Sequence, residues 1–317
     1  MRKLLSLVLL LAAGAALGQT YPSKPVRYIV PFPPGGSADL IARAIAPKMS
    51  ERLGQPIVVE NRPGAGGMIG VDAVAKSAPD GYTIGLAAAG ALSSNVHLYP
   101  SMPYDPAKDL APISNLAMIP FFLVAHPSAA GSVKELIAQA RAKPGALSYG
   151  HGGQGSTMHL AGELLNMLAK VNVQSVPYKG SAPVSSDVLG GQIPFGVVDV
   201  PSSIANVKAG KMRALAVTSK ARIAAAPEVP TFEEAGLPGY EAIGWFGAVA
   251  PANTPREIVN QLNTAVRSTL TSKEMHDKML AQGFNHFLTT PDDAGKFIKN
   301  EVLRFENLIK TQKITAE

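Results

Sequence analysis

Two glycine-rich turns are the segments of this chain best suited to bind an anion. The first spans residues 33–39, Pro-Pro-Gly-Gly-Ser-Ala-Asp, and the second spans residues 150–157, Gly-His-Gly-Gly-Gln-Gly-Ser-Thr. Each follows a strand-like apolar run and precedes a segment with the apolar spacing of a helix. Free N–H groups at a helix start carry partial positive charge and favour anions. Two such starts facing each other across a cleft would hold a small dianion or a carboxylate.

The second turn also matches the pattern G-x-G-x-x-G through Gly150, Gly152 and Gly155. In a nicotinamide-binding protein the next strand ends in an acidic residue that binds the ribose. Here the corresponding segment, residues 173–179, contains no acid. We therefore favour binding of an anion over binding of a dinucleotide, and we expect no cofactor.

The first turn lacks the Gly-Lys-Ser/Thr ending of a nucleotide-binding loop. One interpretation is purely structural, with Ser37 capping the helix and the glycines making the turn. The occurrence of a second, similar turn favours anion binding instead. Asp39 suits the first helical turn, where a negative charge is stabilised; it could also accept a hydrogen bond from a ligand.

Other chemistries find little support. The chain has no cysteine, which removes disulfides, thiol catalysis and cysteine-based metal sites. The six histidines show no H-x-x-x-H spacing, so we expect no metal site. No G-x-S-x-G motif is present, and without a basic cluster nothing indicates nucleic-acid binding. The net charge is +6, of which Arg2 and Lys3 supply two.

The first 18 residues have the pattern of a secretory signal peptide. Arg2 and Lys3 precede an apolar run over residues 4–17, and small residues follow at Gly18. The run is shorter than the roughly 20 residues that a membrane-spanning helix needs. We expect residues 1–18 to be cleaved and the remaining chain to be periplasmic.

Strand-like and helix-like segments alternate along the rest of the chain, which predicts an α/β fold with helices on both faces of parallel sheets. We expect strands at residues 26–32, 57–60, 82–86, 146–149, 171–176, 193–198 and 213–218. We expect helices at residues 37–53, 68–77, 133–143, 157–170, 184–189, 256–271, 273–282 and 291–310. Ligands of such sheets bind at the carboxyl ends of the strands, where both glycine turns fall.

Two longer apolar stretches, residues 116–126 and 242–250, enclose one complete strand–helix series. The chain is also longer than one core usually allows. We therefore expect a discontinuous first lobe of residues 19–120 plus 246–317 and a second lobe of residues 121–245. The two stretches would cross between the lobes as a hinge and permit closure over a ligand.

The chain resembles the periplasmic receptors of tripartite tricarboxylate transporters, often called Bug proteins. The matching segments run through the whole chain after the leader. They are residues 21–27 and 33–39, 59–67, 80–83, 98–100, 103–106, 155–160, 177–180, 189–192 and 230–236.

This resemblance implies a two-lobed periplasmic-binding fold of the type II kind, with two parallel or mixed sheets, flanking helices and a ligand cleft between the lobes. It implies that loop backbone groups and ordered water hold a ligand carboxylate, that no catalysis occurs, and that a membrane permease is the partner of a monomeric receptor. The contacts carried over onto this sequence are Phe32, Gly35, Gly36, Ser37 and Asp39, Ala88 and Ser93 in the loop 87–93, Gly152, Gly155, Ser156, Thr157 and His159, Tyr178 and Asp199.

Two alternatives to a transport receptor stay open at this point. An exported hydrolase or dehydrogenase could use the same cleft, in which case the ligand would be altered on incubation. A ligand-sensing subunit of a signalling system could also use it, in which case its loss would not impair uptake.

Overall fold

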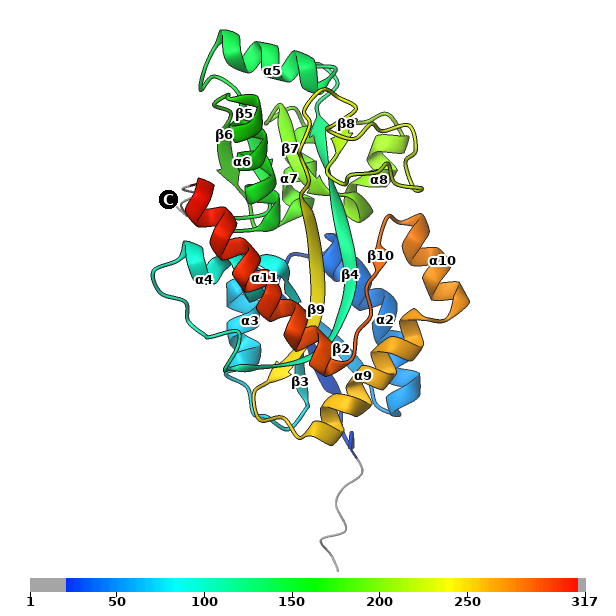
Figure 1. Ribbon diagram of the computed structural model, residues 1–317. Helices are drawn as coiled ribbons and strands as arrows, with labels where there is room; N and C mark the ends of the chain where they lie inside the picture. Colours follow the sequence, from blue (N-terminus) through cyan, green and yellow to red (C-terminus); the bar gives the residue numbers. More distant parts are fainter. Residues whose placement is uncertain (1–20, 313–317) are drawn as a thin grey trace, which may run out of the picture.

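The computed structural model describes residues 21–312, so the expected signal peptide lies outside the described residues. The chain forms two α/β lobes, one above the other in Figure 1, connected by two long strands. These are β4 (Leu110–Ala125) and β9 (Ile243–Pro251), and they pair antiparallel with each other along most of β9. The two-lobed fold expected from the resemblance is confirmed.

The first lobe is built on three parallel strands at its outer edge. The order in the sheet is β2-β1-β3-β9-β4, with β3 antiparallel to β9. The strands are β1 (Val26–Val30), β2 (Ile57–Asn61), β3 (Thr83–Ala88) and, paired with β4, β10 (Asn285–His286). The helices are α2 (Ser37–Leu53), α3 (Met68–Ala75), α9 (Arg256–Leu270) and α10 (Lys273–Ala281).

The second lobe repeats this plan with its own core. Parallel strands β5 (Ser148–His151), β6 (Gln174–Pro177) and β7 (Phe195–Asp199) continue the sheet from β4, and β8 (Arg213–Val217) pairs with β4. The helices are α5 (Val133–Ala142), α6 (Thr157–Ala169), α7 (Ser181–Leu189) and α8 (Val200–Lys208).

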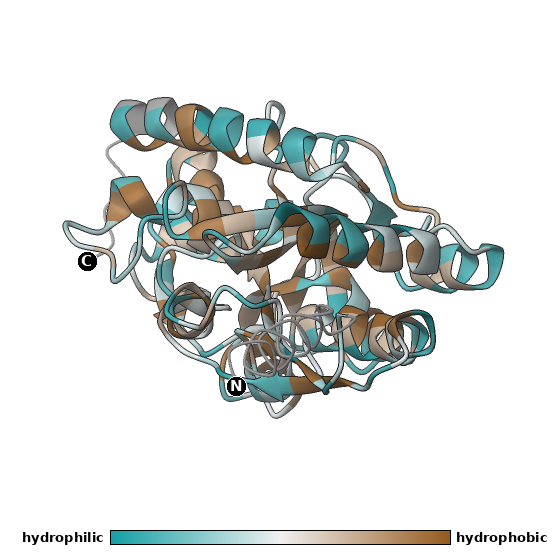
Figure 2. Ribbon diagram, turned by 90° about the horizontal axis from the view of Figure 1, so that it is seen from below, coloured by the Kyte–Doolittle hydropathy of each residue, from teal (hydrophilic) through white to brown (hydrophobic). Residues whose placement is uncertain are grey.

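Helix amphipathicity explains how the layers pack. In α2, Ile41, Ile45 and Met49 recur every four residues and are fully buried against the sheet of the first lobe. Figure 2 shows hydrophilic and hydrophobic residues in bands along the helices. No helix within residues 21–312 is both long and apolar enough to cross a membrane.

Strand β4 belongs to both lobes. Its first part pairs with β9 as far as Pro120, and from Phe121 onward it pairs with β7. The lobe boundaries expected at 120/121 and 245/246 fall inside β4 and β9. We propose these positions as the boundaries, since the change of pairing partner at residue 121 coincides with the first of them.

The C-terminal helix α11 (Pro291–Gln312) runs obliquely across the molecule (Figure 1). Near its end, Phe305 and Ile309 form a small buried cluster with Leu98 and with Leu160 of α6. The helix expected at residues 291–310 is therefore confirmed, and its far end also contacts the second lobe.

Several local expectations need correction. The segment 87–93, expected as a loop, continues β3 and then forms the short helices η2 (Gly90–Ser94) and α4 (Asn95–Leu98). Helix α7 begins at residue 181 instead of 184, because Pro183 is tolerated in a first helical turn. Helix α8 was not expected, although Asp199 followed by Pro201 is a helix-start signal. The short helix η1 (Ala65–Gly67) was also missed.

Candidate functional site

A partly open cavity of about 40 Å³ lies between the two lobes. Its walls come from the starts of α2, α6 and α7, from the end of β7, and from the strands that cross between the lobes. The lining residues are Phe32, Pro33, Gly36, Ser37, Ala38, Gly66, Ala88, Gly90, Ile119, Phe121, Ser156, Thr157, Met158, Ser181, Ala182, Asp199, Gly244, Trp245 and Phe246.

The first lobe presents the uncapped start of α2 to this cavity. The N-cap residue is Gly36, and no side chain caps the helix, so the interpretation of Ser37 as the cap is wrong. Ser37 is instead the first helical residue, and its buried hydroxyl has no hydrogen-bond partner. Without a cap from the Gly36 position, first-turn N–H groups of α2 face the cavity, where the Asp199 carboxyl of the other lobe approaches the Ser37 N–H.

The second lobe presents the start of α6. Ser156 is its N-cap, and the Ser156 Oγ accepts a hydrogen bond of 3.2 Å from the His159 N–H. Thr157 and Met158 follow in the first turn and line the same cavity. Two helix starts, one from each lobe, therefore converge on one space, as the two glycine turns predict.

The remaining walls are mostly apolar. Phe121 and Ile119 come from β4, while Trp245 and Phe246 come from β9. The indole N–H of Trp245 donates to Glu301 at 3.0 Å, which fixes the ring without using a group in the cavity. Such walls would remove the carbon skeleton of a ligand from water.

Half of the expected site residues line the cavity. These seven are Phe32, Gly36, Ser37, Ala88, Ser156, Thr157 and Asp199. The other seven do not line it: Gly35, Asp39, Ser93, Gly152, Gly155, His159 and Tyr178. Their contribution to ligand binding stays a prediction, and the contacts of several of them indicate a supporting role.

Asp39 is fully engaged within its own lobe. Burial opposes its ionisation, but hydrogen bonds from Arg43, Asn61 and the Gly35 N–H outweigh burial and lower the pKa of its carboxyl. Tyr178 donates to Asp187 at 2.7 Å, and the Ser93 hydroxyl donates to the Ala89 carbonyl at 2.6 Å. These contacts shape the loops around the cavity.

Several lining residues are not among the contacts expected from the sequence, and Ser181 and Gly66 are the most informative of these. Ser181 begins α7 directly after Gly180, which repeats the glycine-then-helix pattern of the two recognised turns. That pattern could have revealed it. Gly66 precedes Gly67, the N-cap of α3, so the same glycine-then-helix pattern was present there as well.

The loops of the two lobes also touch each other directly beside the cavity. The Tyr99 hydroxyl donates to the Gln154 carbonyl at 3.1 Å, and the Ser94 hydroxyl donates to the Gly155 carbonyl at 3.3 Å. Glycines allow this approach: a Cβ at Gly90 would lie 2.9 Å from the Gly155 carbonyl oxygen, and one at Gly66 would lie 2.6 Å from that of Gln154. The second glycine turn, residues 150–157, therefore forms part of the contact between the two lobes.

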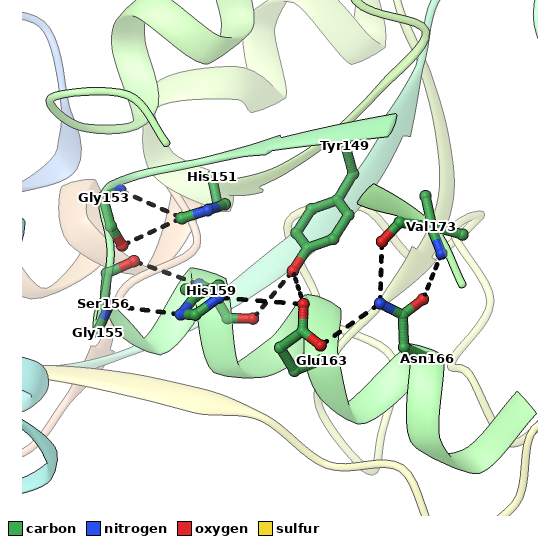
Figure 3. A network of polar contacts seen from close by, with 9 residues as sticks. All are labelled: Tyr149, His151, Gly153, Gly155, Ser156, His159, Glu163, Asn166 and Val173. Atoms are coloured by element: carbon green, nitrogen blue, oxygen red, sulfur yellow. Dashed lines mark hydrogen bonds and ion pairs between the residues drawn. The ribbon is translucent and has the colours of Figure 1, made fainter. Parts of the chain in front are cut away.

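A buried polar network behind the α6 start supports this turn (Figure 3). The imidazoles of His151 and His159 stack with their centroids 4.5 Å apart. His159 Nδ1 accepts the Gly155 N–H, and Tyr149 donates to Glu163 at 2.8 Å. His159 therefore supports the conformation of the second glycine turn through its hydrogen bonds with Gly155 and Ser156.

This network predicts a loss of stability in acid. Burial, with a smaller effect from His159, lowers the pKa of His151 to about 3, whereas an unfolded chain has the ordinary value of about 6.5. The unfolded state therefore binds more protons between these values, and stability falls by about 1.4 kcal/mol per pH unit below about pH 6. Urea unfolding at pH 6.5 and 5 should show a shallower decline for His151→Phe than for the wild type. If the decline were the same in His151→Phe and the wild type, His151 would not be the cause of the acid sensitivity. His276→Phe is the control, because that histidine is exposed at the surface.

Within residues 21–312, no group of three or more potential metal ligands occurs. Two α/β lobes, two strands crossing between them and an apolar cavity with helix starts at its rim define the class of two-lobed solute-binding proteins.

The chain belongs to the tripartite tricarboxylate transporter receptor family, whose model matches residues 41–314. The protein BugT of Bordetella pertussis is 39% identical over 317 residues, covering 98% of this chain and 97% of the relative. The resemblance to Bug receptors is confirmed, and since the family consists of receptors, so is the expectation that the chain is not an enzyme.

Solved structures agree with this membership. A protein of R. palustris with adipate is 39% identical, with a TM-score of 0.89 over 93% of this chain and 99% of that one. The periplasmic binding protein BugD is 33% identical, with the same TM-score and the same coverage. MatC from Rhodopseudomonas palustris with bound malate is 32% identical, with a TM-score of 0.86 over 91% of this chain and all of that one.

Proposed function

We propose that this protein is a periplasmic receptor that captures a small carboxylate between its lobes and delivers it to a membrane permease. The supporting observation is the convergence of the α2 and α6 starts on one cavity whose described lining residues include no lysine or arginine. An anion there would be held by backbone N–H groups and hydroxyls. Relatives solved with adipate and with malate support the same ligand class.

Micromolar binding needs about 8 kcal/mol. Hydrogen bonds to a charged group contribute about 1.5–3 kcal/mol each, so two or three of them contribute about 3–9 kcal/mol. Burial of carbon against Phe121 and Trp245 adds to this and offsets part of the cost of association. The cavity volume of about 40 Å³ favours a small ligand in this conformation.

The test is titration calorimetry of the purified mature chain against mono-, di- and tricarboxylates, with adipate and malate included. We expect one-to-one binding of at least one acid, and the acid should be recovered unchanged after incubation. A folded protein that binds none of the acids, or that converts one, would contradict the proposal. Uptake of the bound acid by a deletion strain separates delivery from sensing, and gel filtration checks the expected monomer.

Ser37→Ala tests how much the Ser37 hydroxyl, at the start of α2, contributes to ligand affinity. Because Gly36 is the N-cap and alanine favours helix, the substitution should leave α2 intact. It removes a buried hydroxyl without a partner, so affinity for the bound acid should fall about fivefold, or about 1 kcal/mol. Calorimetry with a parallel melting curve would check this. A loss as large as that for a blocked cavity would contradict recognition by backbone groups.

A further inference from the structure

Asp199 is the only residue with an ionisable side chain among the described residues that line the cavity. It ends β7, directly precedes α8, and is 6% exposed. A buried carboxyl in a cavity for carboxylates is unexpected, because two carboxylates side by side repel each other. Its position therefore calls for a specific role.

The hydrogen bonds of Asp199 leave acceptor capacity on its side chain. The backbone N–H donates to Ser181 Oγ at 3.0 Å, and the Ser203 hydroxyl donates to the Asp199 carbonyl at 2.7 Å. The Ser202 hydroxyl donates to the side chain at Oδ1. Since an ionised carboxylate can accept about four hydrogen bonds, further acceptor positions remain on its side chain.

Ser37 supplies the complementary group from the other lobe. Its hydroxyl is fully buried, has no hydrogen-bond partner and lines the same cavity. Burial, the largest effect, raises the pKa of the Asp199 carboxyl, while the hydroxyls of Ser202, Ser37 and Ser181 and the Ser37 N–H all approach it and favour its charged form. The cavity thus holds an acceptor and an unused hydroxyl beside each other, one from each lobe.

A ligand hydroxyl suits this pair because it can donate and accept at the same time. An ionised carboxylate cannot donate to Asp199, and an apolar carbon would add no hydrogen bond to either group. We propose that Asp199 and Ser37 make the receptor selective for carboxylates that carry a hydroxyl group, which donates to Asp199 and accepts from Ser37. This inference rests on the proposed function.

The experiment compares acids that differ by one hydroxyl. Calorimetry of the wild type would use lactate with propionate, malate with succinate, mandelate with phenylacetate, and citrate with tricarballylate. In each pair that binds, we expect the hydroxy acid to bind about 10- to 100-fold more tightly, the range of a hydrogen bond to a charged group. Equal affinities within every binding pair would overturn the inference while leaving the receptor function intact. No binding of any acid would overturn the proposed function itself.

Variants then assign the selectivity to Asp199. Asp199→Leu should bring the ratio of the affinities for a hydroxy acid and its matching acid without the hydroxyl close to one. Asp199→Asn, which keeps an acceptor oxygen, should reduce this ratio about tenfold. Asp187→Asn is the matched control, because Asp187 lies in the same lobe, accepts from Tyr178 and does not line the cavity. Circular dichroism confirms folding of each variant. An unchanged ratio in folded Asp199 variants would overturn the assignment; the wild-type ratio tests the selectivity even if a variant fails to fold.

Discussion

Gly155→Val should lower the affinity for the bound acid by about 100-fold or more, although Gly155 does not line the cavity. Gly155 has φ of +73°, where valine is strained, and a Cβ there would lie 2.4 Å from Oδ1 of Asn95 in the other lobe. Strain and overpacking of this kind together cost about 2–5 kcal/mol. The substitution destabilises the closed conformation, in which the loops of the two lobes are in contact. We therefore expect the variant to favour an open form. Calorimetry would measure the affinity, and small-angle scattering with saturating acid would measure the closure.

A single methyl group at a neighbouring position separates closure from local strain. Gly90 lies in a helical turn without positive φ, and although it lines the cavity, a Cβ there would lie 2.9 Å from the Gly155 carbonyl oxygen of the other lobe. Gly90→Ala should therefore also weaken binding, by about tenfold, while leaving the melting temperature nearly unchanged. Gly295→Ala is the matched control, because that helical glycine has only Pro112 Cγ nearby, at 3.9 Å. Wild-type affinity in both Gly155→Val and Gly90→Ala would show that contact between the loops does not matter for binding.

Gly36→Val should weaken binding by a similar factor for a different reason. Gly36 lines the cavity, has an ordinary φ of −77°, and offers space for a Cβ, with the Pro33 carbonyl oxygen 3.8 Å away. The fold should accept valine, while its methyl groups occupy part of a cavity of only about 40 Å³. We expect at least a 100-fold loss of affinity with a wild-type melting temperature, since the buried walls cannot yield without overpacking.

The control for this variant is Gly190→Val, at an exposed glycine that also has a negative φ and ends α7 away from the cavity. The scattering profile distinguishes the two mechanisms, because Gly36→Val should still allow the lobes to close and Gly155→Val should not. If Gly36→Val retained wild-type affinity, the ligand would not approach the start of α2, and the proposed site would be wrong.

Much of the architecture could be predicted because it is encoded locally. The apolar periodicity of Leu40, Ile41, Ala44 and Ile45 predicts α2 with its observed bounds, and the alternation of strands and helices predicts the fold class. The two long apolar stretches indicated the crossing strands β4 and β9, since a strand that serves two lobes is buried along its whole length. The start of α8 is also encoded locally, in Asp199 followed by Pro201.

The sequence by itself determined the two helix starts, because a glycine turn and a following amphipathic helix depend on neighbouring residues. Tertiary structure alone decided what those turns face. It placed Ser37 against Asp199 from the other lobe, set Gly155 against Asn95, and occupied Asp39 with Arg43. These pairings depend on how two separate cores are oriented across β4 and β9, and no local pattern of residues specifies that orientation.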